Sequence, residues 1–470
     1  MSPGYHGAML PLDPSAEDMR AMGRAAVEYL IGFIEGLDDA PASNADAGLE
    51  LASRIAGPPP EAGGAGFEPT METLDAAARR TLEYSGPGYL AYIPGGGLYT
   101  AALGEFLAQG LNRYVGLWQP SPAVVQIEEN VARWLCDLFA FPAGSQGLLT
   151  TGGSMANFSA VVAARSDRLG EDFLDGTYYV SEQVHASVTK AAKLAGFGPR
   201  NLRTVATDDQ LRIDVDDLRR RIREDRAAGM RPFLVVASAG TTNSGAVDPI
   251  ADVVDVAREE DLWMHVDGAY GGFFQLTERG RDRFHGIDGA DSITLDPHKG
   301  LFLPYGTGAL VVRDAQALRE AHHVGADYLQ DLAPPGELPN YSEYSPELSR
   351  DFRGLRVWMP LQVHGVAAFR DALDEKLDLT AYLHDALATL PEIEVPWAPQ
   401  LTTVPFRLAG ADDAGNAAFL ERINAGRRVF LSSTMIHGRY TLRVCILSHR
   451  THRDRIDECI HAIRAAGRER

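Results

Sequence analysis

A His-Lys pair stands in the segment Ser292-Ile-Thr-Leu-Asp-Pro-His-Lys-Gly-Leu-Phe-Leu-Pro-Tyr-Gly-Thr-Gly308, between a short apolar run and a glycine-rich turn. Upstream, the apolar run Trp263-Met-His-Val266 ends in the carboxylate of Asp267. Such runs predict buried strands, and the residues that follow parallel strands gather at one edge of a sheet. A lysine that forms a Schiff base and an aspartate that keeps a pyridine nitrogen protonated are what a site for pyridoxal 5'-phosphate (PLP) requires. Lys299 is therefore a candidate Schiff-base lysine, and if Asp267 is its partner at the sheet edge, the pair predicts a PLP site.

The central region, about residues 88–312, alternates helical periodicity with short apolar runs. Helices are predicted at 124–140 and 155–165. The predicted strands are 147–150, 177–180, 233–237, 263–266, 292–295 and 308–312. Short apolar strands separated by helices are typical of a mainly parallel sheet that is covered on both faces.

The flanking regions have patterns of their own. Ser15-Ala-Glu-Asp18 predicts a capped helix whose apolar stripe must pack on something. The stretch 37–69 is rich in Ala, Gly, Pro and Asp and predicts an extended linker. The polar stretch 334–346 contains two tyrosines and predicts a functional lid or a disordered loop. Beyond it, a helix at 355–390, strands at 402–407 and 440–446 and a helix at 453–466 indicate a smaller domain.

Composition excludes several classes of function. The chain has 470 residues and a net charge of −20, which opposes binding to nucleic acid or to an anionic membrane. Cys136, Cys445 and Cys459 are few and far apart, so we expect no disulfide framework, no zinc site and a reducing cytoplasm. The sequence shows no signal peptide and no apolar run long enough to span a membrane. His322-His323 lacks a nearby ligand set, so no metal site is predicted.

Each candidate site residue also has a simpler interpretation. Lys299 alone could be a surface lysine, Asp267 a helix N-cap, and His185 a cap or surface residue. The turn Thr150-Thr-Gly-Gly-Ser-Met-Ala-Asn157 could be an ordinary strand-to-helix turn, although amides at a helix N-terminus also bind phosphate. It lacks the Gly-Lys-Ser/Thr of a P-loop, which disfavours a nucleotide triphosphate.

Taken together, these residues resemble a known family, the PLP-dependent group II decarboxylases of the aromatic-L-amino-acid decarboxylase type. The similarity runs from the N-terminal helix to the segment 431–443. The motifs that carry it are Thr151-Gly-Gly-Ser-Met-Ala-Asn157, Ser181-Glu-Gln-Val-His185, Ala239-Gly-Thr-Thr242, His265-Val-Asp-Gly-Ala-Tyr270, Asp296-Pro-His-Lys299, Ser345-Pro-Glu-Leu-Ser-Arg-Asp-Phe-Arg353, and Trp118 with Ser121-Pro-Ala123.

The resemblance implies an architecture. The fold would be that of PLP-dependent transferases of fold type I, which is aspartate aminotransferase-like. It has a mainly parallel seven-stranded sheet, a small C-terminal α+β domain and an N-terminal helical segment. We expect an N-terminal dimerisation segment over 1–88, a large PLP-binding domain over 89–375 and a small domain over 376–470. The protein would be a homodimer.

The resemblance also implies roles for single residues. Lys299 looks like the Schiff-base lysine, Asp267 like the partner of the pyridine nitrogen, and His185 like the histidine stacked on the ring. Tyr341 resembles a mobile-loop tyrosine that returns a proton after CO2 leaves and closes over the neighbouring active site, with Tyr344 as the alternative. The further cofactor-binding residues would be Ser154, Met155, Ala156, Thr241, Ala269 and His298.

The expected substrate site departs from the family pattern. Besides His185, it would contain Tyr92, Pro94 and Trp118. Val115-Gly116-Leu117 replaces a segment that usually carries a Phe in relatives, and Tyr92-Ile-Pro-Gly-Gly-Gly97 is rich in glycine. The sequence therefore does not identify which amino acid the enzyme uses.

We expect a cytoplasmic enzyme that decarboxylates an L-amino acid, aromatic or related, to its amine and CO2. One alternative keeps PLP but forms an aldehyde by oxidative decarboxylation, or transfers an amino group. The presence of Tyr341 favours simple decarboxylation, because loss of that proton donor in the family favours oxidative products. A scaffold without catalysis and a nucleotide-binding α/β protein are the remaining alternatives, and intact Lys299, Asp267 and His185 argue against the scaffold.

Overall fold

The structure is a computed structural model that describes residues 12–61, 63–324 and 338–468. Its centre is a seven-stranded sheet with the order β1-β7-β6-β5-β4-β2-β3. The strands are β1 (Gln146–Thr150), β2 (Gly176–Ser181), β3 (Leu202–Val205), β4 (Arg231–Ser238), β5 (Trp263–Gly268), β6 (Ser292–Leu295) and β7 (Gly308–Val312). Only β7 runs antiparallel to its neighbours. The predicted fold class, with its mainly parallel seven-stranded sheet, is confirmed.

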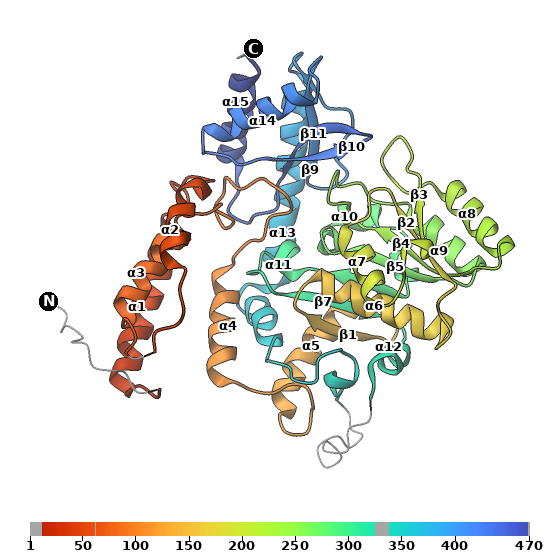
Figure 1. Cartoon of the computed structure of the whole chain (residues 1–470), viewed down its shortest axis with the longest axis horizontal. Coiled ribbons are helices and arrows are strands. Elements are labelled where there is room, and N and C mark those ends of the chain that lie inside the picture. Colours follow the sequence, from red (N-terminus) through yellow and green to blue (C-terminus); the bar gives the residue numbers. More distant parts are fainter. Residues whose placement is uncertain (1–11, 62, 325–337, 469–470) are drawn as a thin grey trace.

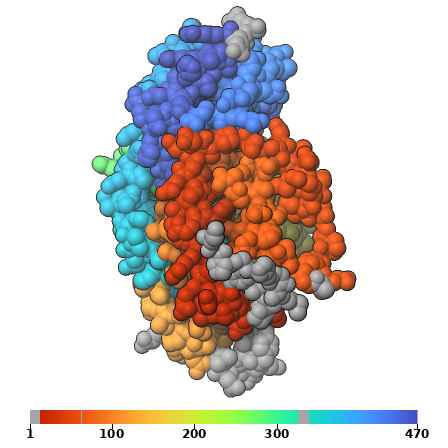
Figure 2. Space-filling view, turned by 90° about the vertical axis from the view of Figure 1, so that its left-hand side faces the viewer, coloured from red at the N-terminus to blue at the C-terminus, as the bar shows by residue number. Residues whose placement is uncertain are grey.

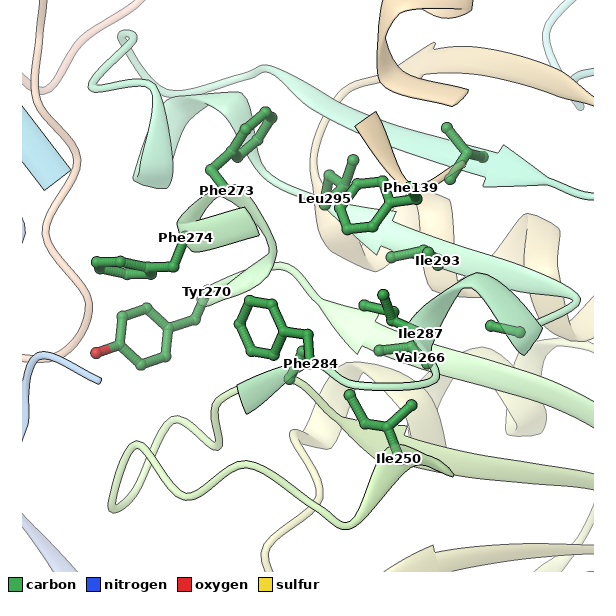
Figure 3. Packing of buried hydrophobic residues seen from close by; sticks show 14 of the residues in the cluster. Phe139, Ile250, Val266, Tyr270, Phe273, Phe274, Phe284, Ile287, Ile293 and Leu295 are labelled. Atoms are coloured by element: carbon green, nitrogen blue, oxygen red, sulfur yellow. The ribbon is translucent and has the colours of Figure 1, made fainter. Parts of the chain in front are cut away.

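Helices cover both faces of this sheet (Figure 1). They are α5 (Pro122–Leu138), α6 (Gly153–Leu169), α7 (Ala186–Leu194), α8 (Val215–Ala227), α9 (Ile250–Glu259), α10 (Glu278–Arg283) and α12 (Ala315–His322). Along β4, Val235 and Ala237 enter one apolar cluster, whereas Leu234 and Val236 enter the other. This alternation is the two-residue period of a strand buried on both sides. Figure 3 shows the first cluster, in which Phe139, Phe284 and Ile250 surround Val266 and Ile293.

The C-terminal region forms a second layer of structure. Its antiparallel sheet has the order β10 (Ser432–Ile436), β11 (Arg439–Cys445), β9 (Thr403–Leu408), β8 (Ile393–Glu394), and it carries α14 (Asp413–Ala425) and α15 (Arg453–Arg468). The predicted helix at 355–390 is α13 (Gly354–Ala388), which a positive φ of 73° interrupts at Gly365. Because α13 continues past residue 375, the boundary between 375 and 376 stays a prediction.

The N-terminal region is more helical than its composition indicated. Ser15 caps α1 (Ala16–Glu35) by accepting a hydrogen bond from the Asp18 amide at 3.2 Å, as predicted. The stretch 37–69 is not a continuous linker, because α2 (Gly48–Ile55) and the start of α3 (Phe67–Ala78) lie in it. The linker prediction was therefore wrong for these turns. None of the residues of α1 is buried.

Two further helices position the site. The helix α4 (Tyr99–Leu111) packs against α13, and the single-turn α11 (Pro297–Gly300) carries His298 and Lys299. In Figure 2 the red and orange N-terminal elements lie across the visible face, below the blue C-terminal part. No helix in the described part of the chain combines the length and apolar character needed to cross a bilayer.

Candidate active site

A pocket of about 240 Å³ opens beyond the carboxyl ends of β1, β2, β5 and β6. Ligands bind at this edge of open α/β sheets because the loops that follow the strands converge there. The lining residues are Thr151, Gly152, Gly153, Ser154, Met155, His185, Ser187, Ala269, Asp296, His298 and Lys299. Six of the predicted cofactor residues are thus brought together. Ala156, Thr241 and Asp267 are buried and do not line this pocket.

The turn between β1 and α6 forms one wall. Gly152 has a φ of 149°, and Gly153 begins the 17-residue helix α6, whose first turn leaves amides without intrahelical partners. A Cβ on Gly153 would lie 3.0 Å from an Asp296 carboxylate oxygen, and a Cβ on Gly308 would lie 2.4 Å from the Gly152 carbonyl carbon. The glycines therefore let the backbones of two segments meet and let the Asp296 side chain approach the turn. This turn fits a phosphate group, which free amides and the helix dipole attract.

Lys299 forms an ion pair on α11. Its Nζ lies 2.8 Å from Oδ2 of Asp296, whose side chain is only 3% exposed. The other carboxylate oxygen, Oδ1, is buried and has no hydrogen-bond partner among the described residues. Asp296 was not predicted as a site residue. Its position three residues before the lysine was the available signal, because residues at this spacing share one helical face.

His298 lies beside this pair, and its hydrogen bond determines which ring nitrogen carries the proton. Its Nδ1 donates to the Thr307 carbonyl at 2.6 Å, since a carbonyl oxygen can only accept. Burial lowers the pKa of His298, so the ring is neutral and Nε2 carries no proton. His298 thus contributes an acceptor nitrogen at the pocket wall.

Asp267 ends β5 and lies directly behind the pocket. Its Oδ1 accepts from the amide of Ala269 at 3.1 Å, and its Oδ2 accepts from Nδ2 of Asn157 at 3.2 Å. No lysine or arginine of the described residues forms an ion pair with this buried carboxylate. A buried charge without a counter-ion is costly, and a protonated pyridine would supply one. The Asp267 carboxylate therefore fits the predicted partner of the pyridine nitrogen.

His185 serves both as a helix cap and as a lining residue. Its Nδ1 accepts from the Ser187 amide at 3.2 Å and lies 2.7 Å from the Ser187 hydroxyl. The simpler interpretation, a cap, and the functional one, a ring-stacking wall, are thus compatible. Ala269, the small residue expected on the other side of the ring, lines the same pocket.

Tyr341 does not reach this pocket within its own chain. It is fully buried, its hydroxyl donates to Oε2 of Glu129 at 2.8 Å, and the Arg350 guanidinium lies 5.3 Å from the ring centroid. Burial, followed by the charge of Glu129, raises the pKa of Tyr341 well above its usual value. The role as proton donor in the neighbouring subunit stays a prediction, and it requires the hydroxyl to leave Glu129. The alternative, Tyr344, is half-buried beside α12 and does not line the pocket either.

The predicted substrate residues separate into two groups. The loop of Tyr92 and Pro94 passes the pocket, since a Cβ on Gly95 would lie 3.2 Å from the His298 carbonyl oxygen. Tyr92 has a φ of 50° and is exposed. Trp118 packs instead with the cluster around Tyr341.

Tyr305, which the sequence did not indicate as a site residue, lies beside His298 of the pocket wall. Its ring centroid lies 5.4 Å from that of His298 and 6.1 Å from that of Tyr84. The two tyrosines are 55% and 40% exposed, so they present aromatic surface beside the pocket. The glycine-rich turn at Gly306 indicated that this segment belongs to the site, but nothing in the sequence indicated that Tyr305 would contact Tyr84.

Comparison with known proteins gives relatives along the whole chain. Residues 71–409 match the family described as "Pyridoxal-dependent decarboxylase conserved domain". The chain is 35% identical to the aromatic-L-amino-acid decarboxylase of Bacillus atrophaeus over 467 residues, 97% of each protein. It is 30% identical to the 4-hydroxyphenylacetaldehyde synthase of Rhodiola rosea, over 80% of this chain and 79% of that protein.

A solved structure gives the same result for the fold. The chain superposes on TDC of Oryza sativa, crystallised with PLP and tryptamine, with a TM-score of 0.92 and 26% identity, covering 98% of this chain and 99% of that one. The lysine, the aspartate behind the pocket and the helix N-terminus fit the cofactor that this family uses. The chain belongs to the family of pyridoxal-dependent decarboxylases.

Proposed function

We propose that this chain decarboxylates an aromatic L-amino acid to the corresponding amine and CO2, with PLP bound in the pocket at Lys299. The observation that carries the proposal is the convergence of Lys299, His185, Ala269 and the turn at Ser154 on one pocket, with Asp267 behind it. The family membership supports the same reaction.

Each residue of the pocket would have a separate role in binding and using the cofactor. When bound, PLP supplies an electron sink that accepts the bonding electrons of the departing carboxylate. Lys299 would bind the cofactor covalently and exchange it for the substrate amine. Asp267 would keep the pyridine nitrogen protonated, since two donors already orient its carboxylate. The amides of the first turn of α6 would hold the phosphate, with Ser154, Met155 and Ala156 at that turn.

Thr241 and Tyr341 do not line the pocket. Thr241 is buried, with its hydroxyl 2.8 Å from that of Ser244, and its contact with the cofactor remains a prediction. Tyr341 is enclosed between α5 and Arg350, so on this geometry we propose that it stabilises the fold of its own chain.

The choice of an aromatic substrate rests on two exposed tyrosines beside the pocket wall. The Tyr305 ring lies next to His298 and contacts the Tyr84 ring, and aromatic pairs add about 0.5–1.5 kcal/mol beyond the area that they bury. The Bacillus atrophaeus relative is named for aromatic substrates, which supports the same class.

We also propose a homodimer in a reducing cytoplasm. Apolar side chains of α1 and α4 lie exposed, with Met19 at 51%, Phe106 at 64% and Leu111 at 51%. A partner subunit would cover this surface, because isolated chains rarely leave large apolar patches in water. The three cysteines are buried and free, as expected where thiols stay reduced.

A second candidate reaction is oxidative decarboxylation to an aldehyde. Two observations favour keeping it: the similarity to the 4-hydroxyphenylacetaldehyde synthase, and the placement of Tyr341 away from the pocket of its own chain. An aminotransferase would use the same cofactor, so product identity has to separate all three.

A screen of amino acids with product analysis tests the proposal. The PLP-loaded protein is incubated with each aromatic amino acid, and with glutamate and lysine as non-aromatic controls. Amine and CO2 in equal amounts, without aldehyde or keto acid, are the expected products. Aldehyde with hydrogen peroxide would support the second candidate, and a keto acid would support the aminotransferase. No product from any aromatic amino acid would refute the proposed substrate class.

A further inference from the structure

Asn157 lies at the centre of a buried group of hydrogen bonds behind the pocket. Its side chain is 1% exposed and contacts four side chains from three elements. Nδ2 lies 2.8 Å from Oγ of Ser187 and 3.2 Å from Oδ2 of Asp267. Oδ1 lies 2.9 Å from Nε2 of His265 and 2.7 Å from Oγ1 of Thr294. Both donors and both acceptor positions of the amide are therefore used.

The carboxylate of Asp267 fixes which way this amide faces. An ionised carboxylate can only accept, so the nitrogen of Asn157, and not its oxygen, must face Asp267. The oxygen then faces His265, whose Nε2 must carry a proton to donate to it. The orientation of the Asn157 amide therefore follows from the chemistry of its two partners.

The donor and acceptor roles of His265, Ser292 and Trp263 follow in the same way. Burial lowers the pKa of His265 to about 4, so the ring is neutral, and with a proton on Nε2 its Nδ1 accepts. Nδ1 lies 2.7 Å from the Ser292 hydroxyl, which itself accepts from Nε1 of Trp263 at 2.8 Å. The Ser292 proton is therefore directed at His265. The donors run in one direction, from Trp263 through Ser292 and His265 to Asn157.

On the pocket side, the hydrogen bonds run from Asn157 through Ser187 to His185. Because the Ser187 hydroxyl accepts from Asn157, its own proton is free to point at Nδ1 of His185, 2.7 Å away. The Ser187 amide donates to the same nitrogen. Nδ1 of His185 is thus an acceptor, which places the ring proton on Nε2, the nitrogen on the edge away from Ser187.

We propose that Asn157 is a positioning residue that orients two pocket groups at once: it holds the Asp267 carboxylate, and through Ser187 it keeps His185 in the Nε2–H form. The proposal rests on the proposed function, in which both groups face PLP. It explains why one amide on the phosphate-binding helix α6 ties β5, β6 and the start of α7 together. His185 then offers an N–H donor to the bound substrate or cofactor.

The test compares Asn157→Asp with Thr294→Val in the full chain. The new carboxyl keeps the shape of the side chain and lies beside the Asp267 carboxylate, so the two groups share one proton between them. The oxygen that faces Ser187 then accepts, so the Ser187 hydroxyl turns to donate to it. Ser187 Oγ then accepts from His185, which favours a proton on Nδ1. Thr294→Val removes one hydrogen bond to the same amide at an equally buried position, but leaves both donors of Asn157 in place.

Two measurements read out the variants. Nitrogen NMR of histidine-labelled protein without cofactor reports the tautomers, with signals assigned by His185→Gln and His265→Gln. Titration with PLP reports affinity. Wild type and Thr294→Val are expected to carry Nε2–H at both histidines. Asn157→Asp is expected to show Nδ1–H at His185 and to bind PLP at least about tenfold more weakly, since Asp267 then shares a proton with its neighbour and attracts the pyridine N–H less strongly.

The outcomes separate this inference from the proposed function. A proton on Nδ1 of His185 or His265 in the wild type would overturn the inference without any variant. So would an Asn157→Asp protein whose His185 tautomer and PLP affinity match those of Thr294→Val. If the wild type fails to bind PLP, the proposed function fails, while the tautomers of the cofactor-free chain still decide the direction of the hydrogen bonds.

Discussion

Lys299 and Asp296 form an ion pair across one helical turn, with Nζ 2.8 Å from Oδ2. The carboxylate also lies against Gly153 of the turn that fits the phosphate. Asp296 therefore neutralises the lysine of the cofactor-free chain at a place where a second anion is expected to bind. The pair must separate when the lysine reacts with a carbonyl group.

Asp296→Asn is expected to strengthen PLP binding. The substitution removes negative charge beside the phosphate and removes the carboxylate that pairs with the lysine amine, and both changes favour the bound state. We expect an increase in affinity of about fivefold, the effect of roughly 1 kcal/mol of relieved repulsion. Titration with PLP at constant ionic strength measures it. Weaker binding by the variant would show that Asp296 assists the phosphate instead of opposing it.

Tyr341→Phe is expected to change stability more than product. Loss of the hydrogen bond to Glu129 should lower the free energy of unfolding by about 1.5–3 kcal/mol, because the acceptor is charged and the tyrosine is buried. Urea denaturation measures this, and product analysis should still find the amine. Tyr344→Phe provides the comparison, because Tyr344 is the alternative tyrosine of the same segment. Aldehyde from Tyr341→Phe at unchanged stability would restore this tyrosine as the proton donor.

The buried His265 is expected to make stability depend on pH. Its pKa is about 4 in the folded chain and 6.5 without the fold, so below pH 6.5 the unfolded state binds more protons. The stabilisation is present above pH 6.5 and is lost as the pH falls toward 4. Between pH 7 and pH 5 this amounts to about 2 kcal/mol. Urea denaturation of wild type and His265→Gln at both pH values isolates the contribution. Equal pH dependence of the two proteins would contradict it.

The positions of the strand ends could be predicted from the sequence, because the polar residues of the motifs directly follow apolar runs. Asp267 and Lys299 follow β5 and β6, and the glycines after β1 allow the turn into α6. The strand β3 escaped notice because Leu202-Arg-Thr-Val205 lies at the sheet edge, half exposed, and has no continuous apolar run. The helix α2 was not predicted because it is a short amphipathic helix within a stretch that is rich in Ala, Gly, Pro and Asp.

The contacts between distant segments could not be predicted. Asn157 belongs to a motif that indicated a phosphate turn, but its bonds to Ser187, His265 and Thr294 depend on the order of strands in the sheet. The spacing of Tyr341 from Arg353 indicated a loop residue. Its burial against Glu129 follows from the packing of that segment on α5, which no local pattern reveals.

The most direct test of Lys299 as the PLP-binding lysine compares the visible absorbance of wild type and of Lys299→Ala, each supplied with PLP. Wild type is expected to show a band that sodium borohydride removes, and to release amine and CO2 from an aromatic amino acid. Lys299→Ala is expected to lack the band and to lose activity by about a thousandfold or more, because it has no amine to bind the cofactor. A wild-type protein without the band, or a Lys299→Ala protein that keeps both the band and the activity, would contradict the central claim.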